Sequence, residues 1–361
     1  MNRERPDVLL VSPGTTEGWR RADSELADVL RELGVSVSVV GSEMRVARHF
    51  RRTMQLTDLA EAAAMRRALS RALRRTTPGT ILFSTTQSTM LQPARRLHGA
   101  AVRFDALAAV NRPGRANALQ HRLERRALAR AAMLLPWGLD PTLRVPDDLT
   151  APAVALPVSI DMPKPGPNRE PIAVTYAGNP DKKGLEVVAQ AWCRASPEGR
   201  RLIVTGLSAE AGRAYLRACG VAEPERLEWA GMLSQDEHRA LVARAEAYLS
   251  ASRIEEYGVA QLEALAGGAL LVTTPSRGPY EALRLARRLE PGIVATVRSP
   301  AALAAALQVA LQLPEPARSE YRQRARALVA PYSREELRRR LERDVLPALL
   351  PAVAASVRSL G

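Results

Sequence analysis

The sequence predicts an α/β protein with two doubly wound domains, each built around a parallel sheet. Short apolar runs typical of buried strands alternate with amphipathic helix patterns along the chain, and this alternation is typical of parallel sheets covered by helices. The 361 residues exceed the size at which one hydrophobic core usually stops growing. Eight of the 26 prolines lie between residues 141 and 171, a density that indicates a linker.

We therefore expect four parts along the chain: a first domain at 1–155, a proline-rich linker at 156–171, a second domain at 172–332 and a C-terminal helical segment at 333–361. Most neighbouring strands are separated by an amphipathic helix pattern. The expected strands lie at 7–12, 35–40, 81–85, 100–105 and 134–136 in the first domain, and at 172–177, 201–206, 227–231, 247–250 and 269–273 in the second.

The composition excludes several classes of function. The net charge is +14, but aromatic residues make up only 4% of the chain, so the stacking platforms of single-strand nucleic-acid binders are missing. All but three of the 52 Lys and Arg residues are arginine, which indicates GC-rich coding as much as function. Two cysteines and four histidines form neither a disulfide framework nor a metal-ligand pattern. We therefore expect a cytoplasmic protein that binds no metal and no nucleic acid.

A basic block lies at residues 44–75, with nine arginines. Such a block suits an anionic membrane surface or an acidic acceptor, and it equally suits a solvated helical face. The longest apolar run, at 345–357, is interrupted by Pro347 and Pro351 and is too short to cross a bilayer. The expected location is therefore cytoplasmic, with at most peripheral contact at the inner face of an anionic membrane.

The most informative segment is 252–268, in which Glu255 and Glu263 stand eight residues apart across a loop-to-helix junction. Gly258 allows a sharp turn, and apolar residues at helical spacing follow it. The free N–H groups at the start of this helix suit a phosphate. A nucleotide sugar fits such a site, because it has phosphates in its centre and hydroxyl groups at both ends. The alternative for Glu263, a solvated helix face, fits poorly with the apolar residues around it.

This segment resembles the E-x7-E signature of the retaining glycosyltransferases of family 4. The usual form is Glu-Gly-Phe-Gly-x4-Glu, and this chain has Glu-Glu-Tyr-Gly-x4-Glu from Glu255 to Glu263. The resemblance implies the GT-B fold, in which two Rossmann-like domains face each other across a cleft and the C-terminal helix crosses back to the first domain. It further implies that Glu255 contacts the donor sugar and Glu263 the ribose.

A second donor-side segment, 177–184, resembles the family pattern Gly-Arg-…-Lys-Gly, whose Arg and Lys bind the donor diphosphate. Lys183 matches that lysine, with Lys182 beside it, and Asn179 stands where the arginine is usual. Arg277, in a loop similar to the family's Gly-Gly-x-x-Glu loop, is a candidate to replace it, although a plain turn explains the loop equally well. The remaining donor-side candidates implied by the resemblance are Tyr257, Gly258, Val259, Gly206 and Met232.

Acceptor-side candidates lie in the first domain. Gly14 and Thr15 follow the first strand, where glycine allows close approach of a ligand to the backbone. Asp105 ends a later strand near the place where family members often carry a sugar-contacting histidine, and Asn111 and Arg112 follow it. A structural loop is an equal alternative for these three residues.

The resemblance implies a retaining glycosyltransferase that uses a UDP- or GDP-sugar, with no cofactor and no metal, because the Asp-x-Asp metal motif is absent. The acceptor would be a glycan, a lipid-linked sugar or a small molecule. The departures at Asn179 and Asp105 leave an alternative open, a catalytically weakened GT-B subunit that binds a nucleotide sugar or serves as a scaffold.

Overall fold

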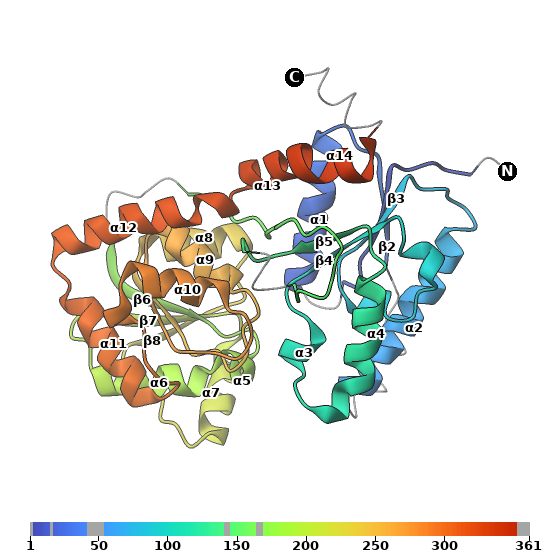
Figure 1. The fold of residues 1–361 in the computed structure, drawn as a ribbon. Helices are drawn as coiled ribbons and strands as arrows, with labels where there is room; N and C mark the ends of the chain where they lie inside the picture. The colour runs from blue at the N-terminus through green and yellow to red at the C-terminus, as the bar shows by residue number, and fades with distance from the viewer. Residues whose placement is uncertain (1–2, 15–16, 42–53, 141–144, 164–168, 352–361) are drawn as a thin grey trace. The chain divides into compact units, whose positions relative to one another are not determined.

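The computed structural model describes residues 3–14, 17–41, 54–140, 145–163 and 169–351. The chain divides into two compact units, which are described separately (Figure 1). Unit 1 comprises Met1–Ser159 and Arg334–Gly361, and unit 2 comprises Ile160–Ser333. Parts of the sequence analysis fall outside the described residues, among them positions 44–53 of the basic block, 164–168 of the linker and 352–361 of the C-terminal segment.

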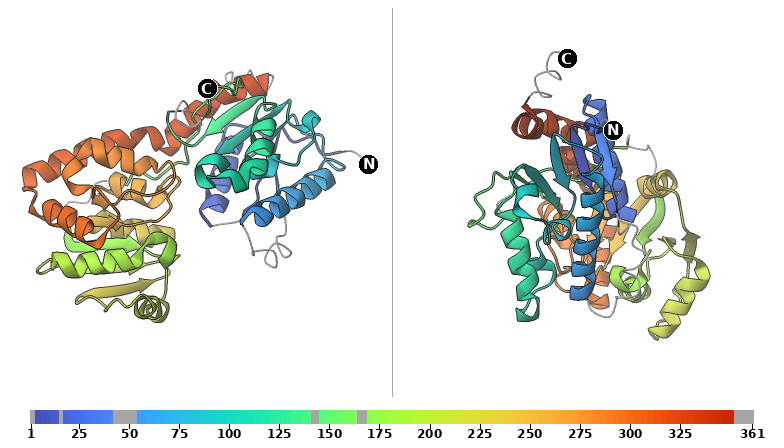
Figure 2. Two further views of the ribbon diagram at one scale, coloured as in Figure 1. Left: turned by 60° about the horizontal axis from the view of Figure 1, so that its bottom comes forward. Right: turned by 90° about the vertical axis from the view of Figure 1, so that its right-hand side faces the viewer.

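Unit 1 contains a five-stranded sheet in the order β2-β1-β3-β4-β5, in which all neighbouring strands are parallel. Its helices connect successive strands and lie on both faces of the sheet (Figure 2). The strands are β1 (Val8–Val11), β2 (Val37–Val40), β3 (Thr80–Phe83), β4 (Ala100–Phe104) and β5 (Met133–Pro136), and the helices are α1 (Glu17–Glu32), α2 (Met54–Ala72), α3 (Ala108–Asn111) and α4 (Ala118–Leu128).

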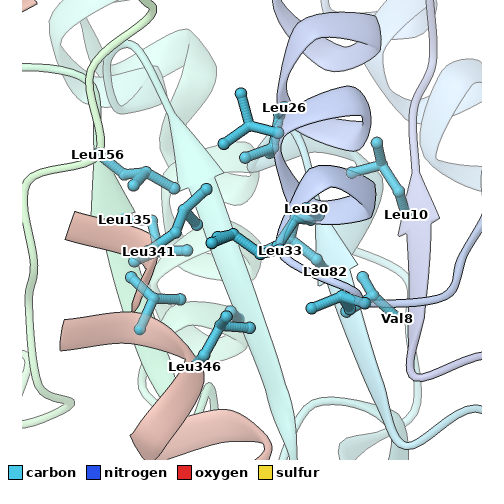
Figure 3. Close-up of a cluster of buried hydrophobic side chains, with 14 of the residues drawn as sticks. Val8, Leu10, Leu26, Leu30, Leu33, Leu82, Leu135, Leu156, Leu341 and Leu346 are labelled. Atoms are coloured by element: carbon cyan, nitrogen blue, oxygen red, sulfur yellow. The ribbon is translucent and has the colours of Figure 1, made fainter. Parts of the chain in front are cut away.

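The two faces of this sheet bury separate apolar clusters. Because successive residues of a strand point to opposite faces, Leu10 of β1 packs with Leu26 of α1 on one face, whereas its neighbour Leu9 packs with Met65 and Leu69 of α2 on the other. Figure 3 shows the first of these clusters. A strand that is buried on both faces needs an uninterrupted apolar run, and β1 has one.

The end of the chain belongs to unit 1. Helix α13 (Arg334–Arg340), a π-helical turn (Leu341–Val345) and α14 (Leu346–Leu349) follow one another. Leu337, Leu341 and Leu346 are buried in the same cluster as Leu26 (Figure 3). Arg334 forms an ion pair with Glu32 of α1 at 2.7 Å. Apolar burial therefore holds this segment against α1, and the ion pair adds to it.

Unit 2 contains a second five-stranded sheet, in the order β10-β9-β6-β7-β8, again with all neighbouring strands parallel. The predicted fold class, two Rossmann-like doubly wound domains, is confirmed. The strands are β6 (Glu170–Tyr176), β7 (Arg201–Thr205), β8 (Leu227–Gly231), β9 (Ala245–Ser250) and β10 (Leu270–Thr273), and the helices are α5 (Pro180–Lys183), α6 (Leu185–Ala195), α7 (Ala209–Ala218), α8 (Gln235–Arg244), α9 (Val259–Gly267), α10 (Glu281–Leu289), α11 (Pro300–Gln312) and α12 (Glu315–Val329).

Strand β6 is the starting strand of unit 2, from which the chain winds first to β7 and β8 and later to β9 and β10. Ligands of open α/β sheets bind beyond the carboxyl ends of the strands, at the point where this winding reverses. The loops after β6, β9 and β10 lie at that edge. No helix in the described part of the chain is long and apolar enough to cross a membrane.

We predict that Leu341→Ala destabilises the protein by about 2–5 kcal/mol, because it leaves a cavity in the cluster that Leu341 shares with α1. Urea unfolding followed by far-UV circular dichroism measures the loss. Arg343→Ala is the matched control, since Arg343 is exposed and its side chain pairs with the adjacent Asp344. We expect this control to change stability by only about 0.5 kcal/mol or less. Equal losses in the two variants would contradict the packing described here.

Candidate functional site

Three loops meet at the carboxyl edge of the unit 2 sheet, and main-chain hydrogen bonds join them. The loop after β9 lies in the middle. Within it, the N–H of Arg253 donates to the carbonyl of Lys182 at 2.8 Å, and the N–H of Glu255 donates to the carbonyl of Arg277 at 2.9 Å. The middle loop is therefore tied to the short helix α5 on one side and to the β10–α10 loop on the other. Backbone pairing, independent of side-chain identity, sets the positions of the candidate residues.

The carboxylate of Glu255 is buried and bound by three donors. Lys183 Nζ lies 2.7 Å from Glu255 Oε2, and Ser252 Oγ and Gln261 Nε2 donate to the same oxygen at 3.1 and 3.3 Å. The side chain of Glu255 is only 9% exposed. A buried carboxylate needs such partners to offset its loss of hydration. Among the described residues, none donates a hydrogen bond to the second oxygen, Oε1.

Lys183 reaches Glu255 because of the backbone at Gly184. This residue has φ +69° between α5 and α6, and a Cβ at this position would overlap the carbonyl oxygen of Ala251 at the end of β9. The missing side chain therefore lets the junction of α5 and α6 approach the end of β9. Lys182, the neighbouring cation, forms a more exposed ion pair with Glu256 at 3.2 Å.

Helix α9 begins directly after Gly258, which has a left-handed backbone at φ +88°. A Cβ there would lie 2.8 Å from the ring of Tyr280, so both the turn and the packing require glycine. The first N–H groups of α9 have no intrahelical acceptor, and the positive end of the helix dipole favours an anion near them. Glu255 precedes this helix start, and Glu263 lies within the helix.

Glu263 is buried, with its side chain 8% exposed, and Arg239 Nε of α8 donates to its Oε1 at 3.2 Å. Arg239 also forms an ion pair with Asp161. The carboxylate is therefore held in a fixed position between two helices. The alternative of a solvated helix face for Glu263 is wrong, because α9 is buried along nearly its whole length.

A half-buried histidine lies next to Glu263. His238 Nδ1 is 3.2 Å from Thr205 Oγ1 at the end of β7, and its ring meets the edge of Tyr176 at 6.0 Å between centroids. Burial lowers the pKa of His238 below its usual value of 6.5, and the nearby carboxylate of Glu263 partly offsets this effect. His238 is therefore held in its neutral form near neutral pH.

The other donor-side candidates lie in different environments. Met232, after β8, is 75% exposed, and Gly206 ends β7. Tyr257 is buried and its ring meets Tyr332. Val259 is the first residue of α9. Arg277 is exposed.

Asn179 has a clear local role. Its side-chain oxygen accepts a hydrogen bond from the N–H of Lys182 at 3.0 Å and so caps the short helix α5. This contact is a helix cap of the usual kind. The amide oxygen of Asn179 therefore helps to set the position of Lys182 and Lys183.

Several residues of this site escaped the sequence analysis. Ser252 and Gln261 hold Glu255, and both lie within the segment 252–268, where their polar side chains were a usable signal. Arg239 and His238 contact or adjoin Glu263 from helix α8, which precedes the segment. No sequence pattern indicates them, because their proximity arises from the packing of α8 on α9.

The acceptor-side candidates lie in unit 1, except Thr15, which is outside the described residues. The carbonyl of Gly14 accepts from Arg20 at 3.0 Å, and a carboxylate oxygen of Asp105 accepts from the N–H of Ala106 at 2.6 Å. Asn111 is the last residue of α3.

Arg112 Nε forms an ion pair with Asp58 of α2 at 2.6 Å. The carboxylate of Asp58 is also bound by Gln120. Arg112 thus ties α3 and α4 to α2, which accounts for a structural role at this position. In the described part of the chain, no group of three or more His, Cys, Asp or Glu residues is arranged to hold a metal ion.

Comparison with known protein families shows which family unit 2 resembles. Residues 171–312 match the family described as Glycosyl transferases group 1. Most of unit 2 is therefore similar to a group 1 glycosyltransferase domain. The protein is accordingly a glycosyltransferase, and the matched segment contains Lys183, Glu255 and Glu263. A comparison with curated protein sequences found no match.

Solved glycosyltransferase structures share the fold of the chain. Sucrose-phosphate synthase from Thermosynechococcus elongatus has a TM-score of 0.68 at 15% identity, with 94% of this chain and 97% of that chain covered. The trehalose-6-phosphate protein from E. coli, solved with UDP-2-fluoro glucose, has a TM-score of 0.66 at 10% identity, with 95% and 99% covered. HepE from Anabaena, solved with UDP and glucose, has a TM-score of 0.63 at 13% identity, with 94% and 98% covered.

We predict that Glu263→Gln lowers the pKa of His238 further, because the carboxylate is the attraction that opposes the effect of burial. An NMR titration of the His238 imidazole measures this change, with Glu210→Gln on the exposed face of α7 as the control. Because its pKa is lower in the folded than in the unfolded protein, His238 contributes its full stabilisation of the fold only above the unfolded pKa of about 6.5. This contribution is lost as the pH falls through the folded pKa. An unchanged or raised pKa in Glu263→Gln would contradict the assignment.

Proposed function

We propose that this glycosyltransferase is a retaining, metal-independent enzyme. It takes a sugar from a UDP- or GDP-sugar and transfers it to a glycan, a lipid-linked sugar or a small-molecule acceptor. The proposal rests chiefly on one observation: two buried carboxylates, Glu255 and Glu263, flank the N-terminus of α9 inside a glycosyltransferase domain, and Lys183 is paired with the first of them. The uridine nucleotides named with HepE and the E. coli protein support this class of donor.

In this proposal the donor diphosphate lies against the first N–H groups of α9, near Gly258 and Val259. Lys183 supplies the nearest cation and Lys182 a second one. The Glu255 carboxylate keeps the partly buried Lys183 ammonium paired until the donor binds. When the bond between the sugar and the phosphate breaks, negative charge grows on the departing diphosphate. A fixed ammonium and a helix N-terminus stabilise that charge.

The ends of the donor fit the two carboxylates. Oε1 of Glu255 is open to accept a hydrogen bond from a sugar hydroxyl, while Oε2 remains bound to Lys183. Glu263, oriented by Arg239, accepts from the ribose hydroxyls. Beyond the ribose, the exposed Met232 and the turn at Gly206 border the base. Tyr257, which is buried, contributes by packing behind the loop.

The acceptor hydroxyl attacks from the same face that the diphosphate leaves and passes its proton to the departing diphosphate, so that the new glycosidic bond retains the configuration. The acceptor candidates of unit 1 remain Gly14, Thr15, Asp105, Asn111 and Arg112. The exposed arginines of α2 suit an acceptor anchored in an anionic membrane, with the enzyme on the cytoplasmic side. The exposed arginines described in this helix are Arg66, Arg67 and Arg71, and the exposed Arg74 and Arg75 follow its end.

A second candidate function follows from Asn179. Because its side chain caps α5, it leaves the diphosphate without the arginine that family members place there. The alternative is therefore a subunit that binds a nucleotide sugar with weak or no turnover. Turnover of donor, with and without acceptor, distinguishes the two functions.

We predict that one class of nucleotide sugar raises the melting temperature of the wild type, and that Glu263→Gln abolishes this rise. A ligand at 100 times its dissociation constant stabilises the folded state by about 2.7 kcal/mol. A thermal-shift panel of UDP-, GDP-, ADP- and dTDP-sugars measures the effect. Glu210→Gln, which changes an exposed carboxylate on α7, retains the shift. If the Glu263→Gln variant binds the nucleotide sugar as tightly as the wild type does, Glu263 is not part of the donor site.

We predict that Lys183→Ala lowers kcat by about 10²–10³-fold, because a fixed charge aimed at the leaving group is lost. Lys183→Arg recovers only part of the rate, since a planar guanidinium does not reproduce a compact ammonium. Lys182→Ala has a smaller effect, because Lys182 is 42% exposed. Nucleotide release in steady state gives these rates. A wild type that binds donor but releases no nucleotide would favour the non-catalytic alternative.

A further inference from the structure

A basic pocket lies at the carboxyl edge of the unit 2 sheet, next to the proposed donor site. Its volume is about 500 Å³, and we name it the Arg277 pocket; its lining residues are Arg253, Ile254, Pro275, Ser276, Arg277 and Arg298. They come from the loops after β9 and β10 and from the segment before α11. Three of the six carry a guanidinium group, and none is acidic.

The carboxylate nearest to two of these arginines is shared. Arg253 Nη2 and Arg298 Nη2 lie 2.8 and 3.0 Å from the same oxygen, Oε1 of Glu186. The other oxygen of Glu186 accepts from the hydroxyl of Tyr215 at 2.9 Å. Arg253 has a second, exposed partner in Asp181 at 3.2 Å. Glu186 and Asp181 thus balance the guanidinium groups of Arg253 and Arg298, and the excess positive charge of the pocket lies on Arg277.

Arg277 has a fixed backbone and an available side chain. Its N–H donates to the carbonyl of Arg253 at 3.2 Å, and its carbonyl accepts from the N–H of Glu255. Its guanidinium is exposed, and within the described residues it forms no ion pair and no hydrogen bond. A guanidinium that is held at the rim of a pocket in this way is suited to bind a carboxylate or a phosphate with two parallel hydrogen bonds.

The pocket adjoins the proposed place of the donor sugar. Ile254 pairs with Arg277 in a parallel bridge, and Glu255 is the next residue along the chain. We propose that the Arg277 pocket binds an oxyanion group, carboxylate or phosphate, that a substrate carries in addition to the donor diphosphate. This inference rests on the proposed function, because that function places the donor sugar near Glu255. The oxyanion belongs either to the donor sugar, as in a uronate, or to a phosphorylated acceptor.

A matched pair of nucleotide sugars tests whether the oxyanion belongs to the donor sugar. UDP-glucose and UDP-glucuronate differ only in the hydroxymethyl group that becomes a carboxylate, and GDP-mannose and GDP-mannuronate are the equivalent pair for a guanine-specific site. Calorimetric titration of the wild type should show about 10- to 100-fold tighter binding of the uronate, the range expected for hydrogen bonds between charged groups. Arg277→Ala should abolish this preference. The affinity of the variant for UDP or GDP alone distinguishes this assignment, in which it is unchanged, from the alternative in which Arg277 binds the donor diphosphate.

To test whether the oxyanion belongs to the acceptor, the binding of glucose 6-phosphate is compared with that of glucose, with and without the nucleotide. A preference for the phosphorylated sugar that disappears in Arg277→Ala assigns the oxyanion to the acceptor. Arg287→Ala, which removes an exposed arginine from α10, is the control and keeps either preference. The backbone hydrogen bonds of residue 277 do not involve its side chain, so we expect Arg277→Ala to fold; a melting temperature equal to that of the wild type checks this.

Two results would overturn the inference. One is the absence of a preference for the anionic member of both pairs in the wild type. The other is a loss of affinity for the nucleotide alone in Arg277→Ala, which would assign Arg277 to the donor diphosphate. Failure of the proposed function has a different signature, in which no nucleotide binds while glucose 6-phosphate still binds in an Arg277-dependent manner.

Discussion

The arrangement of the candidate site depends on the buried carboxylate of Glu255. Its Oε2 atom accepts from Lys183 of α5, from Ser252 of its own loop and from Gln261 of α9. A charge with 9% exposure would be expensive to bury alone, so the fold must bring these three donors together. Residues of three different segments are thereby fixed around one oxygen atom, and the second oxygen is left for a ligand.

The same constraint links binding and charge in this site. Lys183 is neutralised by Glu255 when no ligand is bound, and a diphosphate would bring two further negative charges toward the same ammonium. If Lys183 moves toward the diphosphate, Glu255 keeps only two uncharged donors, Ser252 and Gln261. The attraction between Lys183 and the ligand must therefore offset this weaker stabilisation of the Glu255 carboxylate. The helix N-terminus at Gly258 supplies positive potential without a countercharge, which is why a loop-to-helix junction suits this position better than a second lysine would.

Much of the fold could be predicted from the sequence because buried strands such as β1 and β10 are largely apolar runs. Leu9 and Leu10 point to opposite faces and are both fully buried, so a parallel sheet with two covered faces was the only consistent interpretation. Glu263 was also recognisable, since it stands among apolar residues. Arg239 was not, because its contact with Glu263 joins side chains 24 positions apart across two packed helices. Short-range patterns carry no information on such pairs.

Arginines that form ion pairs with buried carboxylates stabilise this fold, whereas arginines without such a partner are available to a ligand. Arg200 and Arg318 both bind Glu246, which burial and two guanidinium groups hold in place at the opposite, amino edge of the unit 2 sheet. Both guanidinium groups are held by a buried carboxylate, so their contribution is structural. Arg277 has a rigid backbone and no such countercharge among the described residues. In a chain that uses arginine almost everywhere, the missing partner carries more information than the residue type, and it is the physical basis for assigning that pocket to an anion.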